Sequence, residues 1–148
     1  MEFIKEFEVR WADVDANRHM RHTAYNDYAT QLRVALVMGI GVGNEAIENY
    51  EIGSVLFHED TYFYREVVLC EKIKIDLRIR AMSHDGERWQ ILHLIFKENG
   101  ELAAKILVEG AWIDSKRRKL APPPIALLDK FNELPKTEDF EFLTKNSK

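Results

Sequence analysis

The sequence has little of several features that would place it in a specialised class. It holds 1 cysteine in 148 residues, so no internal disulfide can form and a disulfide-stapled domain is excluded. Lys plus Arg number 21 against 25 for Asp plus Glu, and the net charge of −4 disfavours a general nucleic-acid or anionic-membrane binder. The longest nearly apolar run, residues 34–42, is about half of the roughly 20 residues that a membrane-spanning helix needs. We therefore expect no membrane span.

The first residues also lack a basic stretch followed by an apolar one, so we expect a cytoplasmic protein without a secretory signal. What is present, 46% hydrophobic and 31% charged residues, suits a single globular domain with a sizeable core. No repeat or linker interrupts the chain. We expect one domain over residues 1–121, followed by a C-terminal segment, 122–148, with a proline-rich turn, a short helix over 125–131 and a polar tail that frays from Pro135.

Hydrophobic periodicity predicts the first elements. Residues 3–11 alternate between apolar and polar, as in a strand with one solvated face. Apolar residues from Tyr25 to Leu36 fall at helical spacing and predict a long helix with a buried stripe, for which Thr23 is a suitable N-cap. Three glycines are expected to end or loosen this helix: Gly39, Gly41 and Gly43. A short second helical piece is expected over 44–50.

The rest of the chain reads as strands. Alternation is cleanest over 72–82, where only one face is expected to be buried. Asp85-Gly86 and Asn99-Gly100 are hairpin signals that join consecutive strands into an antiparallel meander. Trp89, Ile91 and Ile95 share one parity, which we take as an exposed apolar row that favours self-association. The predicted strands span residues 54–65, 72–82, 89–96 and 102–114.

An antiparallel sheet with one solvated face and one long helix has a simple packing solution, in which the sheet curls around the helix and buries its stripe. The sequence therefore predicts an α+β domain of this kind.

The junction between the first strand and the long helix is dense in ionisable groups. Asp13, Asp15, His19 and His22 precede a helix N-terminus, which offers unpaired backbone N–H groups and a partial positive charge. Those donors could polarise a carbonyl oxygen while a carboxylate attacks the carbonyl carbon or activates water, which is acyl-transfer chemistry. Two other interpretations stay open. The loop could simply cap the helix, or His19-x-x-His22 with an aspartate could bind a metal. Because further ligands at diagnostic spacing are missing, we expect no metal site.

The run from Arg10 to Asp15, followed by residues 19–25 and Arg33, resembles the opening signature of the 4-hydroxybenzoyl-CoA thioesterase group of hot-dog-fold acyl-CoA thioesterases. The resemblance covers roughly residues 3–124. It implies the hot-dog fold, a curved antiparallel sheet wrapped around one long central helix. It also implies hydrolysis of an acyl-CoA thioester to a carboxylic acid and coenzyme A. No metal or redox cofactor is expected, since coenzyme A enters as part of the substrate.

The resemblance also assigns roles to residues. Asp15 occupies the position of the catalytic carboxylate, as nucleophile or general base, and His22 matches a histidine near the helix start. The backbone N–H groups at His22 and Thr23 would hold the thioester oxygen. His19 and Tyr25 are further candidates for substrate contact. In the basic cluster 116–119, Arg117 and Arg118 are candidates to bind the phosphates of coenzyme A. They would make this contact at the site of a neighbouring subunit.

This sequence departs from the family pattern at three places. The usual Gly-Asp turn before the middle strand is Glu71-Lys72, a surface change with no obvious mechanistic consequence. Gln31 stands where a helix glutamate is frequent, so no acidic role is carried to that position. Arg18, Arg21 and His22 replace small or amide residues, which makes the expected mouth of the pocket more basic.

Two alternative functions are retained beside the thioesterase. The same fold could act as a hydratase or dehydratase on an acyl thioester, or as a non-catalytic acyl-CoA-binding protein. A thiol-release assay distinguishes these from hydrolysis. Because hot-dog domains generally pair, we expect a homodimer or a homotetramer. The acyl group, whether aromatic or aliphatic, and its carrier, coenzyme A or an acyl-carrier protein, stay open.

Overall fold

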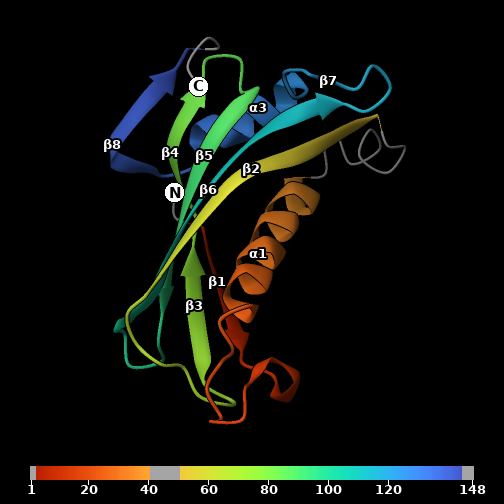
Figure 1. The fold of residues 1–148 in the computed structure, drawn as a ribbon. Helices are drawn as coiled ribbons and strands as arrows, with labels where there is room; N and C mark the ends of the chain where they lie inside the picture. Colours follow the sequence, from red (N-terminus) through yellow and green to blue (C-terminus); the bar gives the residue numbers. More distant parts are fainter. Residues whose placement is uncertain (1–2, 41–50, 145–148) are drawn as a thin grey trace.

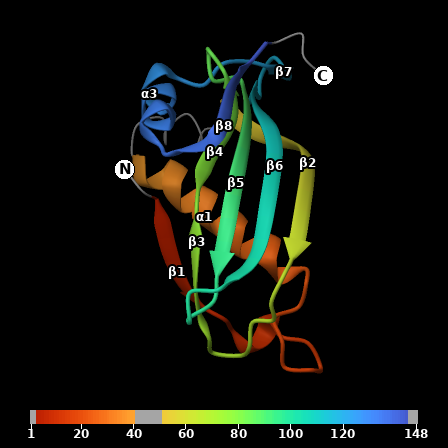
Figure 2. The same ribbon diagram turned by 90° about the vertical axis from the view of Figure 1, so that its left-hand side faces the viewer.

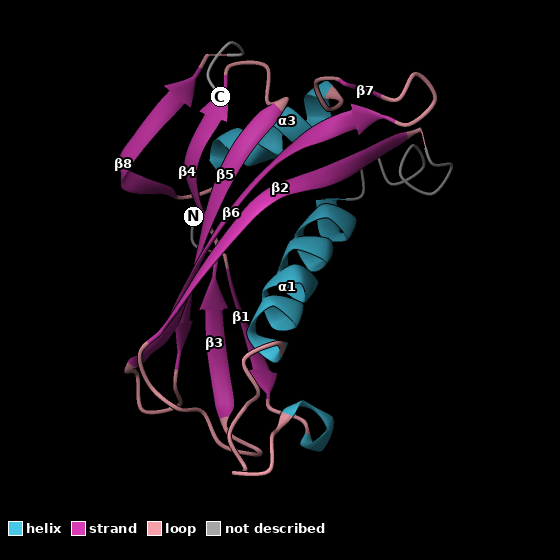
Figure 3. Cartoon of the chain, viewed as in Figure 1, coloured by secondary structure: helices cyan, strands magenta, loops and turns pink. Residues whose placement is uncertain are grey.

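The computed structural model describes residues 3–40 and 51–144 (Figures 1 and 3). The helical piece expected over 44–50 lies outside the described residues. In chain order, the elements are β1 (Ile4–Glu8), the short 3-10 turn η1 (Trp11–Asp13), α1 (Ala24–Ile40), β2 (Ile52–Phe63), β3 (Lys72–Asp76), β4 (Arg78–Ser83), β5 (Arg88–Phe96), β6 (Leu102–Asp114), β7 (Lys119–Leu120), α3 (Ile125–Glu133) and β8 (Lys136–Leu143).

One sheet contains all the strands. β5 pairs with β3 and β4 on one side and with β6 on the other, and β2 lies outermost on β6. β1 and β8 both border the β3–β4 side, where β8 is the one parallel partner of β4. Figure 2 shows the strands side by side with α1 lying across one face of the sheet. The predicted α+β arrangement of a sheet curled around a long helix is confirmed.

The predicted strand over 72–82 is divided at Leu77 into β3 and β4. The alternation fails at this break, because Ile75, Asp76 and Leu77 are all buried. Asp76, which the pattern places on the wet face, is 5% exposed. Its carboxylate accepts a hydrogen bond from the backbone N–H of Leu94 and pairs with Arg78 at 3.0 Å, which compensates its burial.

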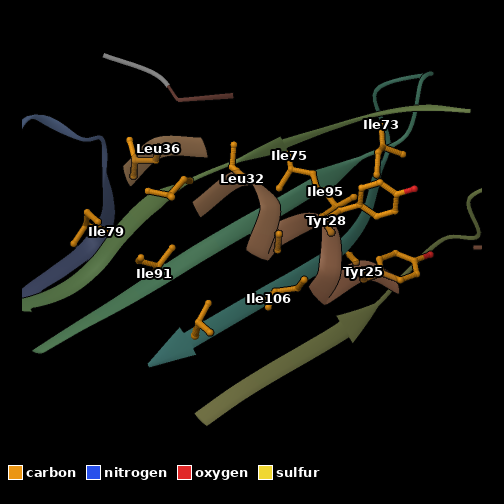
Figure 4. Close-up of a cluster of buried hydrophobic side chains, with 14 of the residues drawn as sticks. Tyr25, Tyr28, Leu32, Leu36, Ile73, Ile75, Ile79, Ile91, Ile95 and Ile106 are labelled. Carbon is orange, nitrogen blue, oxygen red and sulfur yellow. The ribbon is translucent and has the colours of Figure 1, made fainter. Parts of the chain in front are cut away.

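The core lies between α1 and the concave face of the sheet (Figure 4). The predicted helical stripe is confirmed, since Tyr25, Tyr28, Leu32 and Leu36 are all buried. The expected exposed row is wrong. The side chains of that row are buried because they belong to the face that the sheet turns toward α1: Trp89 is 6% exposed, Ile91 3% and Ile95 0%.

Two glycines make the predicted hairpin turns possible. Gly86, between β4 and β5, has φ +77°, and Gly100, between β5 and β6, has φ +90°. Glycine adopts this left-handed region without a steric penalty. Gly39 lies inside the last turn of α1 rather than beyond its end, and Gly41 and Gly43 lie outside the described residues.

The C-terminal segment contains the predicted helix as α3, but the expectation that the chain frays from Pro135 is wrong. Residues 136–143 form β8, which gives the edge of β4 a backbone partner. Arg80 on β4 pairs with Asp139 at 2.9 Å, and Phe142 stacks on His84 with ring centroids 4.0 Å apart. The polar composition of the segment gave no signal for a strand. Its few apolar side chains are nevertheless enough to attach it to the sheet.

Candidate active site

The loop between β1 and α1 is tied to the segment that follows β2. Within the loop, Val14 bridges to Met20, and the N–H of Asp15 donates to the carbonyl of His19 at 2.8 Å. Across it, the N–H of Met20 donates to the carbonyl of Val67 at 2.7 Å. These bonds turn the chain back on itself directly before the helix, so that the loop residues surround the N-terminus of α1.

Asp13 braces this loop. It is 2% exposed, and its carboxylate accepts hydrogen bonds from Arg10 at 2.9 and 3.1 Å, from Arg21 at 3.3 Å and from the Tyr28 hydroxyl at 2.6 Å. The hydrogen bonds from Arg10 lower the pKa of Asp13. A carboxylate so fully occupied cannot also attack a substrate. The contact with Asp13 also occupies Arg21, so this arginine is not a free cation at the mouth of the loop.

Asp15 is held differently. Its Oδ1 accepts the backbone N–H groups of Asn17 at 2.9 Å and His19 at 3.2 Å. Within the part of the chain that the structure describes, no hydrogen bond reaches Oδ2. The side chain is exposed. The loop therefore fixes one oxygen of this carboxylate and leaves the other available for chemistry.

Asp15 lines an open pocket of about 350 Å³, which we call the Asp15 pocket. Four of the residues proposed from the sequence meet here, namely Asp15, His19, His22 and Tyr25. The wall opposite the helix comes from the end of β2 and the residues after it. The complete lining is Asp15, His19, Met20, His22, Tyr25, Phe63, Tyr64, Arg65 and Glu66.

The histidines differ in their surroundings. His19 is half-buried, and its Nε2 lies 3.2 Å from a carboxylate oxygen of Glu66. His22 is exposed, and no hydrogen bond joins it to Asp15 or to another group among residues 3–40 and 51–144. Both line the pocket with Asp15, but only His22 is left available for a ligand.

Two backbone donors lie at the start of α1, one on His22 in the pocket lining and one on the next residue, Thr23, which is outside the lining. For the N–H groups of His22 and Thr23, no acceptor is found within the described ranges. The Thr23 hydroxyl contacts Arg21 and makes no bond to the first helical turn in the described chain, so the expected side-chain cap is missing. Free N–H groups at the positive end of a helix are suited to bind an oxygen that gains negative charge.

Sequence reasoning missed the wall made by β2. The Tyr25 ring packs edge-on against Phe63 with centroids 5.0 Å apart, and Glu66 pairs with His19. Residues 62–65, Tyr-Phe-Tyr-Arg, are a dense aromatic run at the end of the predicted strand. A strand that runs back along the preceding helix ends beside the start of that helix. The aromatic run at the end of the predicted strand was therefore the signal that could have placed it beside the loop.

The basic cluster lies elsewhere in the chain. Arg117 and Arg118 occupy the turn between β6 and β7, at the end of the sheet opposite the loop that carries Asp15 (Figure 1). Arg117 lies 4.0 Å from Asp114, and both arginines are exposed. A single chain therefore does not bring these two residues to the Asp15 pocket.

None of the helices in the described residues is both long and apolar enough to cross a membrane. Among those residues, no group of three or more His, Cys, Asp or Glu side chains is arranged to hold a metal ion.

One long helix wrapped by a sheet that is antiparallel except at the β4–β8 pair defines a hot-dog domain. The chain belongs to the Thioesterase-like superfamily, which matches residues 9–131. No curated protein matches the sequence.

Solved structures share the fold. The hypothetical protein SAV2348 from Staphylococcus aureus, in complex with CoA, has a TM-score of 0.81 at 20% identity, covering 93% of this chain and 88% of that one. Slr0204, a 1,4-dihydroxy-2-naphthoyl-CoA thioesterase from Synechocystis, has a TM-score of 0.79 at 17% identity, covering 90% and 97%. A DHNA-CoA thioesterase from Staphylococcus aureus has a TM-score of 0.78 at 21% identity, covering 89% of each chain. At these identities the likeness establishes the fold.

Proposed function

We propose that this protein is an acyl-CoA thioesterase in which Asp15 is the catalytic carboxylate. The observation that carries the proposal is the position of this side chain, with Oδ1 held by two backbone N–H groups and Oδ2 available in the Asp15 pocket. Membership of the Thioesterase-like superfamily, two CoA-thioesterase neighbours and a CoA-bound neighbour support the substrate class.

This geometry supports the following reaction. The thioester oxygen lies against the N–H groups of His22 and Thr23, which stabilise the negative charge that develops there. Oδ2 of Asp15 either attacks the carbonyl carbon, expelling the thiolate and forming a mixed anhydride that water hydrolyses, or removes a proton from an attacking water. In both routes the products are a carboxylic acid and coenzyme A. His22 and Tyr25 position the substrate, and His19 holds the loop through Glu66.

The test is thiol release from a panel of acyl-CoAs, with Asp15→Asn compared against a matched control. Asp27→Asn makes the same change in the first turn of α1, outside the pocket lining. Asp15→Asn should lower kcat by about 100-fold or more, while Asp27→Asn stays within about twofold. Equal activity of both variants would remove Asp15 from the mechanism. Turnover of an enoyl thioester without thiol release would favour a hydratase, and saturable binding without turnover would favour a binding protein.

Rapid-quench mass spectrometry separates the two roles of Asp15. A peptide carrying Asp15 and gaining the mass of the acyl group in the first turnover identifies the carboxylate as a nucleophile. A first turnover that releases acid with no such adduct at any quench time identifies it as a general base.

We also propose that the protein self-associates through β2. Within the described residues this strand pairs only with β6, which leaves its other edge open along 12 residues. Exposed apolar side chains lie along it: Leu56, Phe57, Tyr62 and Phe63 are 48%, 55%, 55% and 51% exposed. Long open edges with apolar side chains favour pairing with another strand.

A two-fold axis at the middle of β2 would set Ile52 of one copy opposite Phe63 of the other. Ile52 pairs with Asp114, directly before the basic turn, and Phe63 lines the Asp15 pocket. The turn that holds Arg117 and Arg118 would then face the Asp15 pocket of the second copy. This arrangement reconciles the proposed phosphate contact with the separation of the two sites in one chain.

A further inference from the structure

A second pocket lies far from Asp15 in the chain. It has a volume of about 400 Å³ and is formed by the later turns of α1, the first half of β2 and the neighbouring strands. We call it the Arg33 pocket. It shares no lining residue with the Asp15 pocket, and Arg33 lies ten residues beyond Thr23, about 15 Å along the helix.

The walls of the Arg33 pocket are mostly apolar. Val34 and Val37 come from α1, Leu56 from β2, and Phe131 from α3. Trp89 and Trp112, on β5 and β6, complete the lining with indole rings. Such a wall favours a hydrocarbon chain or ring, and it leaves few groups that could orient a ligand.

Arg33 is the charged group of this lining. One terminal nitrogen, Nη1, lies 2.9 Å from Nε2 of His93, and the other, Nη2, donates to the Thr30 hydroxyl at 2.9 Å. A guanidinium carries five N–H donors, so these bonds leave donors to spare.

The contact with His93 brings no counter-charge. Nδ1 of His93 lies 2.9 Å from the carbonyl oxygen of Asp76, which can only accept, so Nδ1 carries the proton. Nε2 must then accept from Arg33, and the imidazole is neutral. Its burial and the charge of Arg33 lower the pKa of His93 to about 3.

Arg33 is therefore a half-buried cation held by two neutral groups. Among the described residues it forms no salt bridge, and the acid that acts on it is Glu59, through space rather than by contact. A cation withdrawn from water without an anionic partner is costly, and an anion supplied by a ligand offsets that cost.

From these observations we propose that the Arg33 pocket binds a carboxylate on an apolar body, with the carboxylate on Arg33 and the hydrocarbon along the tryptophan wall. Two sources share this chemistry. One is a free carboxylic acid, and the other is an acyl thioester whose acyl group ends in a second carboxylate. The proposal does not depend on the catalytic role of Asp15.

The tryptophans provide a direct measurement. The sequence has 3 tryptophans, and Trp11, the one outside the pocket, is 80% exposed. In a Trp11→Phe background, fluorescence then reports on Trp89 and Trp112 alone. Octanoate, 1-octanol and octylammonium present the same chain with a negative, neutral or positive head. Octanoate should bind saturably and about tenfold more tightly than octanol, with octylammonium weakest.

Two variants test the role of Arg33. Arg33→Gln should lower octanoate affinity about tenfold, to that of octanol, and leave octanol unchanged. Because this variant removes a bond to buried His93, Val34→Asp tests the same charge with that bond kept, and it should weaken octanoate at least about fivefold and octanol less than about twofold. Arg18→Gln, an exposed arginine outside the lining, is the matched control. Equal binding of octanoate and octanol, or octanoate binding that neither variant weakens, would overturn the proposal.

Hydrolysis of octanedioyl-CoA and octanoyl-CoA distinguishes the two sources. An Arg33-dependent preference for octanedioyl-CoA identifies the distal carboxylate of a substrate, whereas Arg33-dependent binding of octanoate alone identifies a free acid. Asp15→Asn should leave octanoate binding unchanged. Loss of thiol release in that variant and loss of octanoate binding in Arg33→Gln are therefore independent results, so either proposal can fail without the other.

Discussion

The hydroxyl of Tyr28 donates a 2.6 Å hydrogen bond to Oδ2 of Asp13, and this contact joins the loop after β1 to the second turn of α1. The same hydroxyl accepts the backbone N–H of Arg10 at 3.2 Å. One buried phenol thus satisfies groups at both ends of η1, which ends two residues before Asp15. The position of the proposed catalytic carboxylate therefore depends on a hydrogen bond between two residues that take no part in the proposed reaction.

Tyr28→Phe should destabilise the fold by about 1–3 kcal/mol, because it leaves the buried Asp13 carboxylate without one of its donors. Urea unfolding at neutral pH measures the change. Tyr64→Phe is the matched control, since Tyr64 follows β2, is 45% exposed, and its loss of a hydroxyl should cost less than about 0.5 kcal/mol. Equal effects of the two variants would show that the Tyr28 contact contributes nothing.

Asp13 should make stability depend on acid pH. The hydrogen bonds from Arg10 lower its folded pKa below the ordinary 3.8, so its contribution is present above about pH 4 and is lost as the pH falls through the folded pKa. The stability difference between wild type and Asp13→Asn should therefore be largest near neutral pH and should shrink below about pH 4. A difference that stays constant from pH 7 to pH 2 would contradict this ionisation.

His93 should remain neutral through the physiological range, because burial and Arg33 lower its pKa to about 3. Its ring nitrogens should show no titration by NMR between pH 5 and 8, with the proton on Nδ1. In the unfolded chain, the His93 ring takes up a second proton near pH 6.5, so falling pH between about 6.5 and 3 costs up to about 1.4 kcal/mol of stability per unit. His93→Gln should flatten this part of the stability curve, and an unchanged slope would contradict the assignment.

The open edge of β2 predicts self-association that a single surface change weakens. Phe57 is 55% exposed and its ring lies 5.9 Å from the Arg88 guanidinium. Phe57→Asp places a charge on the edge and can pair with Arg88, so the monomer stays folded while the interface is disfavoured. Light scattering should show a dimer or larger assembly for wild type and a monomer for Phe57→Asp at micromolar concentration. A monomeric wild type would refute the assembly.

The basic turn predicts a defect that depends on the nucleotide part of coenzyme A. Arg118→Gln should raise KM for acyl-CoA about three- to tenfold with kcat unchanged, because a phosphate loses its charged partner. The same acyl group on pantetheine lacks the nucleotide phosphates, and its KM should not change. Lys130→Gln on α3 is the control for general charge. A KM change of the same size with both thioesters would argue against phosphate recognition.

Much of the fold could be predicted because its signals are local. The helical spacing from Tyr25 to Leu36 describes α1, and the glycines at 86 and 100 mark the hairpins. Wrong predictions of strand faces arose because a local pattern does not show which other element packs against a face. Trp89, Ile91 and Ile95 alternate as an amphipathic strand does, yet only the curvature of the sheet determines that their face meets α1.

In the candidate site, too, the tertiary structure decides what the local sequence does not. The two aspartates of the loop are indistinguishable by residue type and lie two positions apart. Their environments separate them: three side chains occupy Asp13, whereas backbone N–H groups hold only one oxygen of Asp15.

The sequence by itself determined a domain of one long helix and an antiparallel meander, and a helix start rich in acids and histidines. Periodicity, turn residues and composition are properties of neighbouring positions, so they can be read along the chain. The tertiary structure alone decided that the end of β2 walls the Asp15 pocket, that Arg33 meets a neutral His93 in a second pocket, and that the C-terminal segment becomes β8. Those outcomes depend on burial and on contacts between residues far apart in the sequence. Such contacts determine whether a charged group is paired or remains available.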